Sequence, residues 1–175
     1  PHISCNTTSD KLQQFSTQPI CTIYLQYPQQ MKMKLMMTGV QDGISQWIFD
    51  RRICGQDGLM SVIISAEGDH MELDNKALTR SVIDELAILM PDWPKPFDSI
   101  VIREKRATFT CQPGVSKYRP DHKTSIKGCW LAGDYTNTGL PATLEGGIRS
   151  GLECARAVIQ SIEGIQSIGE ERQNA

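Results

Sequence analysis

The sequence predicts a mixed fold of the α/β (α+β) kind, in which a mostly antiparallel sheet with one covering helix is followed by a strand, a loop and a helix. Short β-rich runs between residues 20 and 65 alternate with turns, which is the order typical of antiparallel hairpins. After one amphipathic helix, segment 128–162 passes from an apolar run through a Gly-rich loop into a second helix. With 175 residues and 39% hydrophobic content, the chain is long enough to bury a core.

The first predicted strand is Ile20–Tyr27, between Pro19 and Pro28. The polar residues before it predict a ragged entry or a short helix around residues 11–15. Both faces of the strand carry bulky side chains, so we expect an interior strand. Its alternation puts one set of residues on one face and a second set on the other: Cys21, Ile23, Leu25 and Tyr27, against Ile20, Thr22 and Tyr24.

Segment 29–37 contains four methionines among basic residues. Methionine fills irregular apolar surfaces, so a core edge or a loop is the favoured interpretation and a lipid-contacting lip is the alternative. A strand over residues 44–51 follows, with Ser45, Trp47 and Phe49 on one face, and then a buried strand over residues 59–65.

Asp74 is a plausible N-cap for a helix whose apolar side carries Leu78, Val82, Leu86 and Met90. The prolines of segment 91–96 end this helix. A strand over residues 99–105 then leads into a turn-rich arm that reaches Pro120.

The stretch around which the chain is organised runs from an apolar strand ending at Ala132, through a polar loop, to a helix over residues 144–162. Unpaired N–H groups and the helix dipole meet at such a helix start, which suits an anion or a carbonyl group. Asp134 is the only acid between strand and helix, and Gly147, Gly151 and Ala155 form a ridge without bulky side chains. Judged on residue types alone, a plain strand–turn–helix with a solvated aspartate explains the pattern equally well.

Composition excludes several classes of function. The formal net charge of −2 gives no basic face for nucleic acid, and no apolar run reaches membrane-spanning length. The six cysteines show no paired spacing with one another or with the three histidines, so we expect reduced thiols in a cytosolic setting and no metal site. The histidines lie in polar, loop-like surroundings and are expected to be solvated.

The sequence LAGDYTNTGLPATLEGGIRSG, residues 131–151, resembles the flavin motif of the FAD-dependent amine oxidase and phytoene desaturase superfamily. Its Gly-Leu-Pro-Ala-Thr portion is most similar to the squalene-associated FAD-dependent desaturases, the group that includes hydroxysqualene dehydroxylase. Segments 46–51, 62–65 and 106–109 resemble the same group in the same order. Two positions depart from its pattern, Gly147 and Cys154, where alanine is usual, and both keep the site small.

The resemblance implies a FAD site and assigns residues to it. Gly133 and Asp134 would lie against the ribityl-phosphate region, and the N–H of Leu144 would face the flavin N1–C2 edge. Pro141, Ala142 and Thr143 would pass close to the ring face, and Gly147 is a further candidate for cofactor binding. The resemblance also makes Tyr24, Trp47 and Phe49 candidate walls of an apolar substrate tunnel, although each also suits an ordinary sheet core. No set of catalytic side chains can be named.

The resemblance implies a FAD-dependent oxidoreductase that reduces hydroxysqualene to squalene, with carotenoid desaturation or amine oxidation as alternatives. No GxGxxG turn for the FAD pyrophosphate is present, so we expect a C-terminal fragment that is inactive alone. The expected organisation is a substrate-domain portion (1–126), the closing strand and helix of the FAD domain (127–163) and a polar tail (164–175).

The expected partners are a long apolar isoprenoid, the missing N-terminal FAD-binding half and a possible second copy of the chain. The expected location is the cytoplasm, with peripheral contact at the inner membrane. A non-catalytic interaction domain that keeps the scaffold without cofactor is the alternative of another class.

Overall fold

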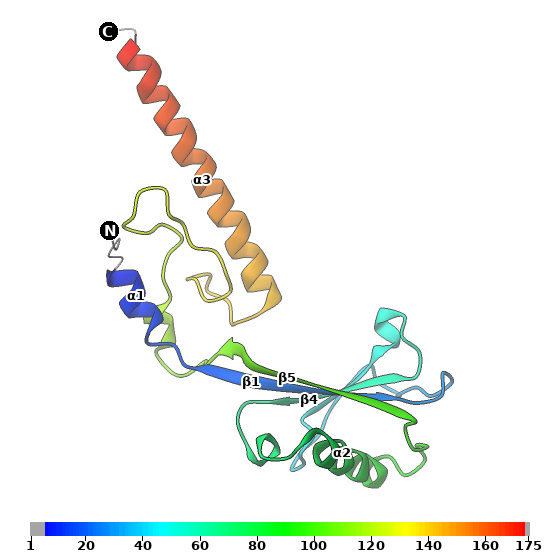
Figure 1. The fold of residues 1–175 in the computed structure, drawn as a ribbon. Coiled ribbons are helices and arrows are strands. Elements are labelled where there is room, and N and C mark those ends of the chain that lie inside the picture. Colours follow the sequence, from blue (N-terminus) through cyan, green and yellow to red (C-terminus); the bar gives the residue numbers. More distant parts are fainter. Residues whose placement is uncertain (1–5, 174–175) are drawn as a thin grey trace. The chain divides into compact units, whose positions relative to one another are not determined.

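The computed structural model describes the backbone of residues 6–173 and the side chains of residues 8–162 (Figure 1). Its contacts divide the chain into two compact units. The sheet unit is Thr17–Ala107, and the loop–helix unit combines residues 1–16 with residues 108–175. The mixed α/β class is confirmed, whereas the division at residues 126 and 163 stays a prediction.

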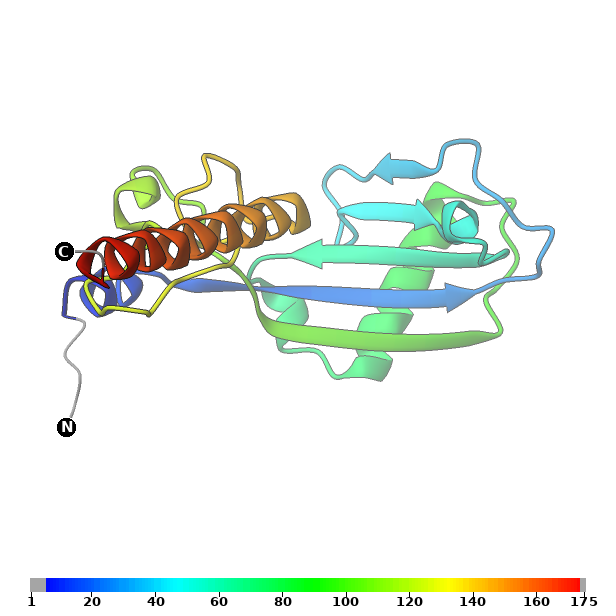
Figure 2. The same ribbon diagram turned by 90° about the horizontal axis from the view of Figure 1, so that it is seen from above.

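The sheet unit contains five strands in the order β2-β3-β4-β1-β5, which lie side by side in Figure 2 with one helix behind them. The β1–β4, β3–β4 and β2–β3 pairs are antiparallel, as the sequence predicts. The bounds of the strands are Thr17–Gln26 (β1), Met37–Gly39 (β2), Trp47–Asp50 (β3), Leu59–Ser65 (β4) and Asp98–Phe109 (β5). Two short 3-10 turns lie between these elements: η1 (Arg51–Cys54) joins β3 to β4, and η2 (Asp69–Met71) lies between β4 and the helix that follows.

Helix α2 (Asn75–Leu89) covers one face of the sheet and closes the core. The Asp74 carboxylate accepts a hydrogen bond of 2.7 Å from the Ala77 N–H, so the predicted N-cap is confirmed. Fully burying an aliphatic side chain contributes about 1.5–3 kcal/mol, so this layer dominates the stability of the unit. The buried residues come from the predicted faces: Leu78, Val82 and Leu86 of α2, and Cys21, Ile23, Leu25, Ile48, Met60, Val62 and Ile64 of the strands.

Glu85 fastens the loop before β3 to α2, which the sequence did not predict. Its two carboxylate oxygens accept hydrogen bonds from the N–H groups of Ile44 (2.7 Å) and Ser45 (2.9 Å). A side chain at Gly43 would collide with the same carboxylate, so the close approach requires glycine. Ser45 is therefore fully buried and does not share the exposed face of Trp47.

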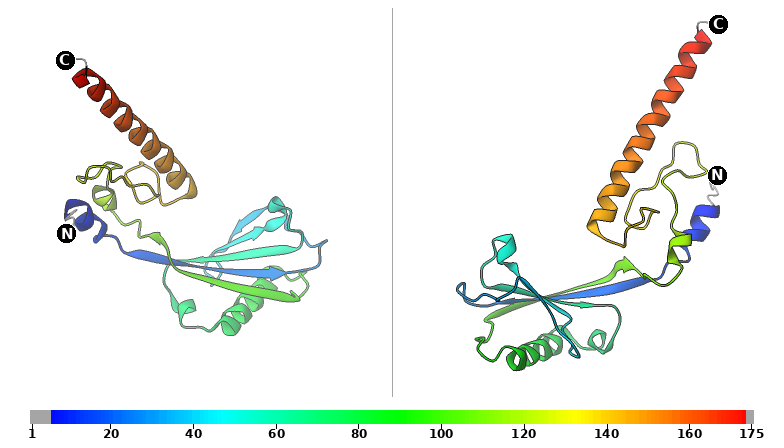
Figure 3. Two further views of the ribbon diagram at one scale, coloured as in Figure 1. Left: turned by 45° about the horizontal axis from the view of Figure 1, so that its top comes forward. Right: turned by 180° about the vertical axis from the view of Figure 1, so that it is seen from behind.

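The loop–helix unit contains α1 (Asn6–Leu12), η3 (Val115–Tyr118) and α3 (Leu144–Gln173). The short helix expected around residues 11–15 is α1, which begins and ends earlier. Helix α3 continues beyond the predicted end at residue 162. Figure 3 shows the loop of residues 119–143 running beside the first turns of α3 in both views.

The predicted buried strand ending at Ala132 is wrong. Within the part of the chain that the structure describes, this stretch makes only one isolated bridge, between Trp130 and Lys123. A buried strand needs ladder partners on both sides, and no such partner faces these residues. Cys129 is instead exposed and lines an open apolar groove of about 410 Å³ together with Leu12 and Leu131.

The apolar side of α3 is exposed. Leu144 at the first turn is 89% exposed. The side of α3 that faces the loop carries Gly146, Ser150 and Cys154, which are small and buried. The same exposure continues along the helix at Ile148, Leu152, Ile159 and Ile162.

No helix among the described residues is both long and apolar enough to cross a membrane.

Candidate functional site

Thr143 directly precedes α3 and caps its N-terminus. Its hydroxyl accepts a hydrogen bond of 3.1 Å from the Gly146 N–H, and its carbonyl accepts one of 3.0 Å from Gly147. The N–H groups of Leu144 and Glu145 donate to no acceptor within the described chain. These two donors, at the positive end of the helix dipole, remain available to a ligand.

Arg119 holds the loop that precedes the helix. Its guanidinium donates to the carbonyls of Leu140 (2.6 Å) and Asp134 (2.7 Å) and to the Thr138 hydroxyl (3.0 Å). Only 6% of Arg119 is exposed, and its guanidinium lies 5.4 Å from the centre of the Phe109 ring. The bonds join both ends of segment 134–140 to one side chain, which fixes the loop.

A second anchor joins the loop to α3. The Ser150 hydroxyl accepts a hydrogen bond of 2.9 Å from the Gly133 N–H and lies 2.7 Å from the hydroxyl of Thr136. The Thr136 hydroxyl in turn donates to the Gly133 carbonyl at 2.9 Å. Thr136 and Ser150 are fully buried, so their bonds set the distance between loop and helix.

Gly133 is the tightest point of the loop. Its φ of 150° lies where other residues are strained, and a Cβ there would lie 2.5 Å from the Tyr135 ring. Burial, followed by the neighbouring Asp134 and Cys154, raises the pKa of Tyr135 above its ordinary value, so its hydroxyl stays neutral.

The predicted cofactor ligands gather in this loop and the first turn of α3. The Asp134 carboxylate makes no hydrogen bond with any other described residue, so it remains available. A Cβ on Gly147 would lie 3.9 Å from the Asp134 N–H, which brings the two residues together. A Cβ on Gly151 would meet nothing within 4 Å, so of the two glycines of the predicted ridge only Gly147 lies near the loop. The role of each of these residues as a flavin ligand stays a prediction.

The expectation of solvated histidines is wrong for His70, and His2 lies outside the described residues. Only 7% of His70 is exposed: it lies in η2, and the Arg103 guanidinium donates to its backbone carbonyl at 3.3 Å. Burial, and then the Arg103 charge, lower the pKa of His70 below its ordinary value despite the opposing charge of Asp69. His122 is half-buried and contacts the carboxylate of Glu153 at 3.1 Å.

The three predicted substrate-binding residues lie on the face of the sheet away from α2. Register places Tyr24 opposite Ser61, and Ser61 opposite Phe49, so these side chains form one row on one face. Trp47 begins the neighbouring row, opposite Ile63, and is 43% exposed. The structure therefore brings Tyr24, Trp47 and Phe49 together on an open face.

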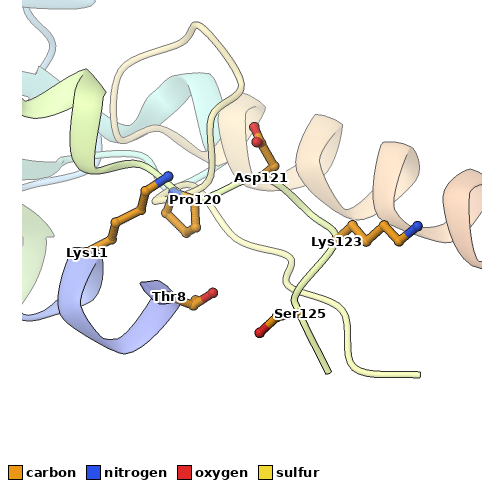
Figure 4. A pocket seen from close by; sticks show the side chains of 6 residues that line it. All are labelled: Thr8, Lys11, Pro120, Asp121, Lys123 and Ser125. Carbon is orange, nitrogen blue, oxygen red and sulfur yellow. The ribbon is translucent and has the colours of Figure 1, made fainter. Parts of the chain in front are cut away.

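A small polar pocket of about 140 Å³ lies between α1 and the loop after Pro120. Figure 4 shows Thr8 and Ser125 lining it, whereas the Lys123 ammonium extends away. None of the predicted site residues lines this pocket. No cluster of three potential metal ligands occurs among the residues described by the structure.

Comparison with known proteins identifies the family of the chain. The family model of flavin-containing amine oxidoreductases matches residues 1–159. A hydroxysqualene dehydroxylase of Rhodopseudomonas palustris is 33% identical, with 70% of this chain and 28% of that protein covered. The corresponding protein of Zymomonas mobilis is 34% identical, with 67% and 27% covered. A 15-cis-phytoene desaturase of Glycine max is 26% identical, with 65% and 21% covered.

One solved structure shares the fold. A protein from Exiguobacterium sp. 255-15, assigned as a protoporphyrinogen oxidase, matches with a TM-score of 0.64 at 15% identity. The match covers 88% of this chain and 36% of that chain. The chain thus spans between a quarter and a third of the length of the dehydroxylases that it matches.

Proposed function

Because the chain belongs to the family of flavin-containing amine oxidoreductases, we propose that the intact protein is a FAD-dependent oxidoreductase of long isoprenoids. The reaction we assign is the reductive removal of the hydroxyl group of hydroxysqualene to give squalene. The observation that supports it is a rigid loop that keeps its donors and its acid unused, in a chain similar to hydroxysqualene dehydroxylases. The chain covers under a third of those relatives, so activity belongs to the intact protein.

FAD fits the residues of this loop. The unused Asp134 carboxylate would accept a hydrogen bond from a ribityl hydroxyl, and the free Leu144 N–H would donate to the carbonyl edge of the flavin. Gly133, Pro141, Thr143 and Gly147 present little bulk beside these two groups. When bound and reduced, the flavin would supply the two electrons of the reaction, and the protein supplies orientation and a dry cavity.

The open face of the sheet suits a long apolar substrate. Tyr24, Trp47 and Phe49 would contact the hydrocarbon chain and exclude water from the reacting carbon. In the proposed reaction the C–OH bond is replaced by a C–H bond, two electrons and two protons are consumed, and the oxygen leaves as water. The contacts of the described residues identify no side chain as the acid that protonates the departing hydroxyl oxygen.

The reaction can be tested with the purified intact protein. Flavin absorbance should accompany the protein, and hydroxysqualene supplied with a chemical reductant should be converted to squalene, detected by mass spectrometry. A flavin-loaded protein that leaves hydroxysqualene unchanged would contradict the assigned reaction. The same protein with an Asp134→Ala change provides the flavin-depleted control.

Desaturation of phytoene is the second candidate, because plant phytoene desaturases also match the chain. Desaturation removes electrons from the substrate, whereas dehydroxylation delivers them. Incubating the flavin-loaded protein with phytoene and a quinone acceptor distinguishes the two: new conjugated double bonds would favour the desaturase.

The proposal includes a location and an assembly. A long isoprenoid dissolves in membranes, so the protein would act in the cytoplasm with peripheral contact at the inner membrane. The exposed apolar side of α3, which includes Leu144 and Ile148, would be covered either by the remainder of the flavin domain or by a second copy.

A further inference from the structure

Segment Met31–Met37 and turn η1 (Arg51–Cys54) are joined into one feature, which we call the lip. Met33 is buried in the core and anchors the segment. The Asp50 carboxylate accepts hydrogen bonds from the N–H groups of Met33 (2.8 Å) and Arg52 (3.0 Å). The Asp50 N–H donates to the Met36 carbonyl at 2.9 Å. The lip is therefore held in a defined conformation.

Asp50 is ionised in this arrangement. Burial disfavours its charge, but the N–H groups of Arg52 and Met33 and the Arg52 guanidinium at 2.9 Å outweigh burial and lower the pKa of Asp50. The Asp50 carboxylate balances the charge of Arg52, with which it pairs at 2.9 Å, so the net positive charge of the lip comes from Lys32, Lys34 and Arg51.

The outer side of the lip is apolar. Four of its large apolar side chains are exposed: Leu35 (62%), Met36 (44%), Met37 (50%) and Ile53 (72%). Single exposed apolar residues are ordinary, but a contiguous group on one structural feature marks a surface that another apolar phase covers.

Three cations lie next to these apolar side chains in the sequence. Lys32, Lys34 and Arg51 belong to the lip, and none of the three forms an ion pair within the described chain. Arg51 donates instead to the Gln56 side-chain oxygen at 3.0 Å. The two segments contain no acid. Exposed aliphatic and methionine side chains flanked by unpaired cations match the chemistry of an anionic bilayer surface.

The lip is continuous with the face of the sheet that carries the predicted substrate residues. Met37 lies opposite Phe49, which lies opposite Ser61, which lies opposite Tyr24. Met37 therefore belongs to the lip and also begins the row that ends at Tyr24. Figures 1 and 3 show η1 on the opposite side of the sheet from α2, which is the side of this row.

We propose that the lip inserts into the interface of an anionic lipid bilayer and passes the isoprenoid to the sheet face along the row Met37–Phe49–Ser61–Tyr24. The nature of the passenger rests on the proposed function, whereas the bilayer contact rests on the lip alone. A protein partner would need acidic residues positioned opposite Lys32 and Lys34. An anionic bilayer presents negative charge across its whole surface, so it needs no such positioning.

The bilayer contact is tested by co-sedimentation of the intact protein with vesicles of phosphatidylcholine and phosphatidylglycerol in equal amounts. Leu35→Gln combined with Met36→Gln should lower binding about tenfold or more, because each apolar side chain loses its transfer from water. Lys32→Gln combined with Lys34→Gln should lower it about fivefold for each lysine, and only on the anionic vesicles. Ile88→Gln on α2, where Ile88 is 80% exposed, is the matched control and should bind normally.

Vesicle binding that is unchanged in both double variants, or that falls equally in the Ile88 control, would overturn the proposal. A double variant that changes only the oligomeric state would show that the lip joins two copies of the chain, which also overturns it. Normal vesicle binding in a protein that converts no hydroxysqualene would contradict the proposed reaction and leave the bilayer contact supported. Turnover of detergent-dispersed substrate by a variant that no longer binds vesicles would support both.

Discussion

Arg119 carries its charge in the interior of the loop–helix unit, and no described carboxylate forms an ion pair with it. Its hydrogen bonds go to two carbonyls and one hydroxyl of the flavin-type loop. Removing it leaves those carbonyls without donors, so Arg119→Met should lower the free energy of unfolding by about 3 kcal/mol. Chemical denaturation of the chain measures this loss.

Arg149 is the matched control for Arg119. It forms an exposed ion pair with Glu145, four residues earlier on α3, and such pairs contribute about 0.5 kcal/mol or less. If Arg149→Met destabilises the chain as much as Arg119→Met does, the loop anchor has no special role.

Replacing Asp134 tests whether its carboxylate binds FAD. Asp134→Ala removes a carboxylate that bonds to nothing in the described chain, so stability should be retained. In the intact protein, loss of a charge-assisted hydrogen bond to the ribityl chain should cost about 1.5–3 kcal/mol of FAD binding. Flavin content after dialysis measures the effect, with the exposed Asp10→Ala as control. Normal flavin content in the Asp134 variant would exclude it as a ligand.

His70 makes stability depend on pH. The folded chain keeps His70 neutral because its pKa is lowered, whereas the unfolded chain protonates it near the ordinary value of about 6.5. The unfolded state therefore binds more protons as pH falls below that value, and stability falls with it until the folded pKa is reached. His70→Gln should flatten the decline in melting temperature between about pH 7 and pH 5. An unaltered profile would show that another group is responsible.

Single residues also show how far sequence can predict a site. The motif predicts that Gly133, Asp134 and Leu144 lie in one loop and helix start, and the structure brings them together because their spacing is local. Arg119 was missed because an arginine before proline in a turn-rich arm resembles a solvated loop residue. Its role depends on contacts with residues 15 to 21 positions away, and no periodic pattern records such contacts.

At the scale of elements, period-two alternation grouped the residues that share a face of β1, and the bulk on both faces predicted an interior strand, which lies between β4 and β5. The same reasoning failed for the apolar run before Ala132, since hydrophobic composition reveals a preference for burial and not the presence of partner strands. It also failed to indicate that the apolar side of α3 is left open, because a helical stripe looks the same whether or not another element covers it.

The open side of α3 predicts self-association of the isolated chain. Ile148 and Leu152 are exposed on this side, and burying them between two copies removes apolar area from water. The chain should therefore sediment as a dimer or larger species, and Ile148→Asp combined with Leu152→Asp should shift it toward monomer. A monomeric parent chain in analytical ultracentrifugation would contradict this prediction.

At the scale of the whole molecule, the chain as given should not retain FAD. It offers the flavin side of a site and contains no glycine turn for the pyrophosphate. Association costs several kcal/mol before any contact contributes, so the remaining ligands should hold FAD weakly. We expect a colourless preparation by absorbance spectroscopy. A yellow preparation with one flavin per chain would show that the loop–helix unit suffices.

The sheet unit is an insertion within the loop–helix unit. The chain leaves the latter after Ser16 and returns to it at Thr108, and the two hydrogen bonds between Ser16 and Thr110, both 2.8 Å, lie beside this exit and return. One junction therefore separates the two structural units. Recombination that exchanges residues 17–107 would replace the proposed substrate face while leaving the loop of residues 133–143 and its anchors, Arg119 and Ser150, unchanged. A lineage could in this way acquire new substrates without rebuilding its redox chemistry.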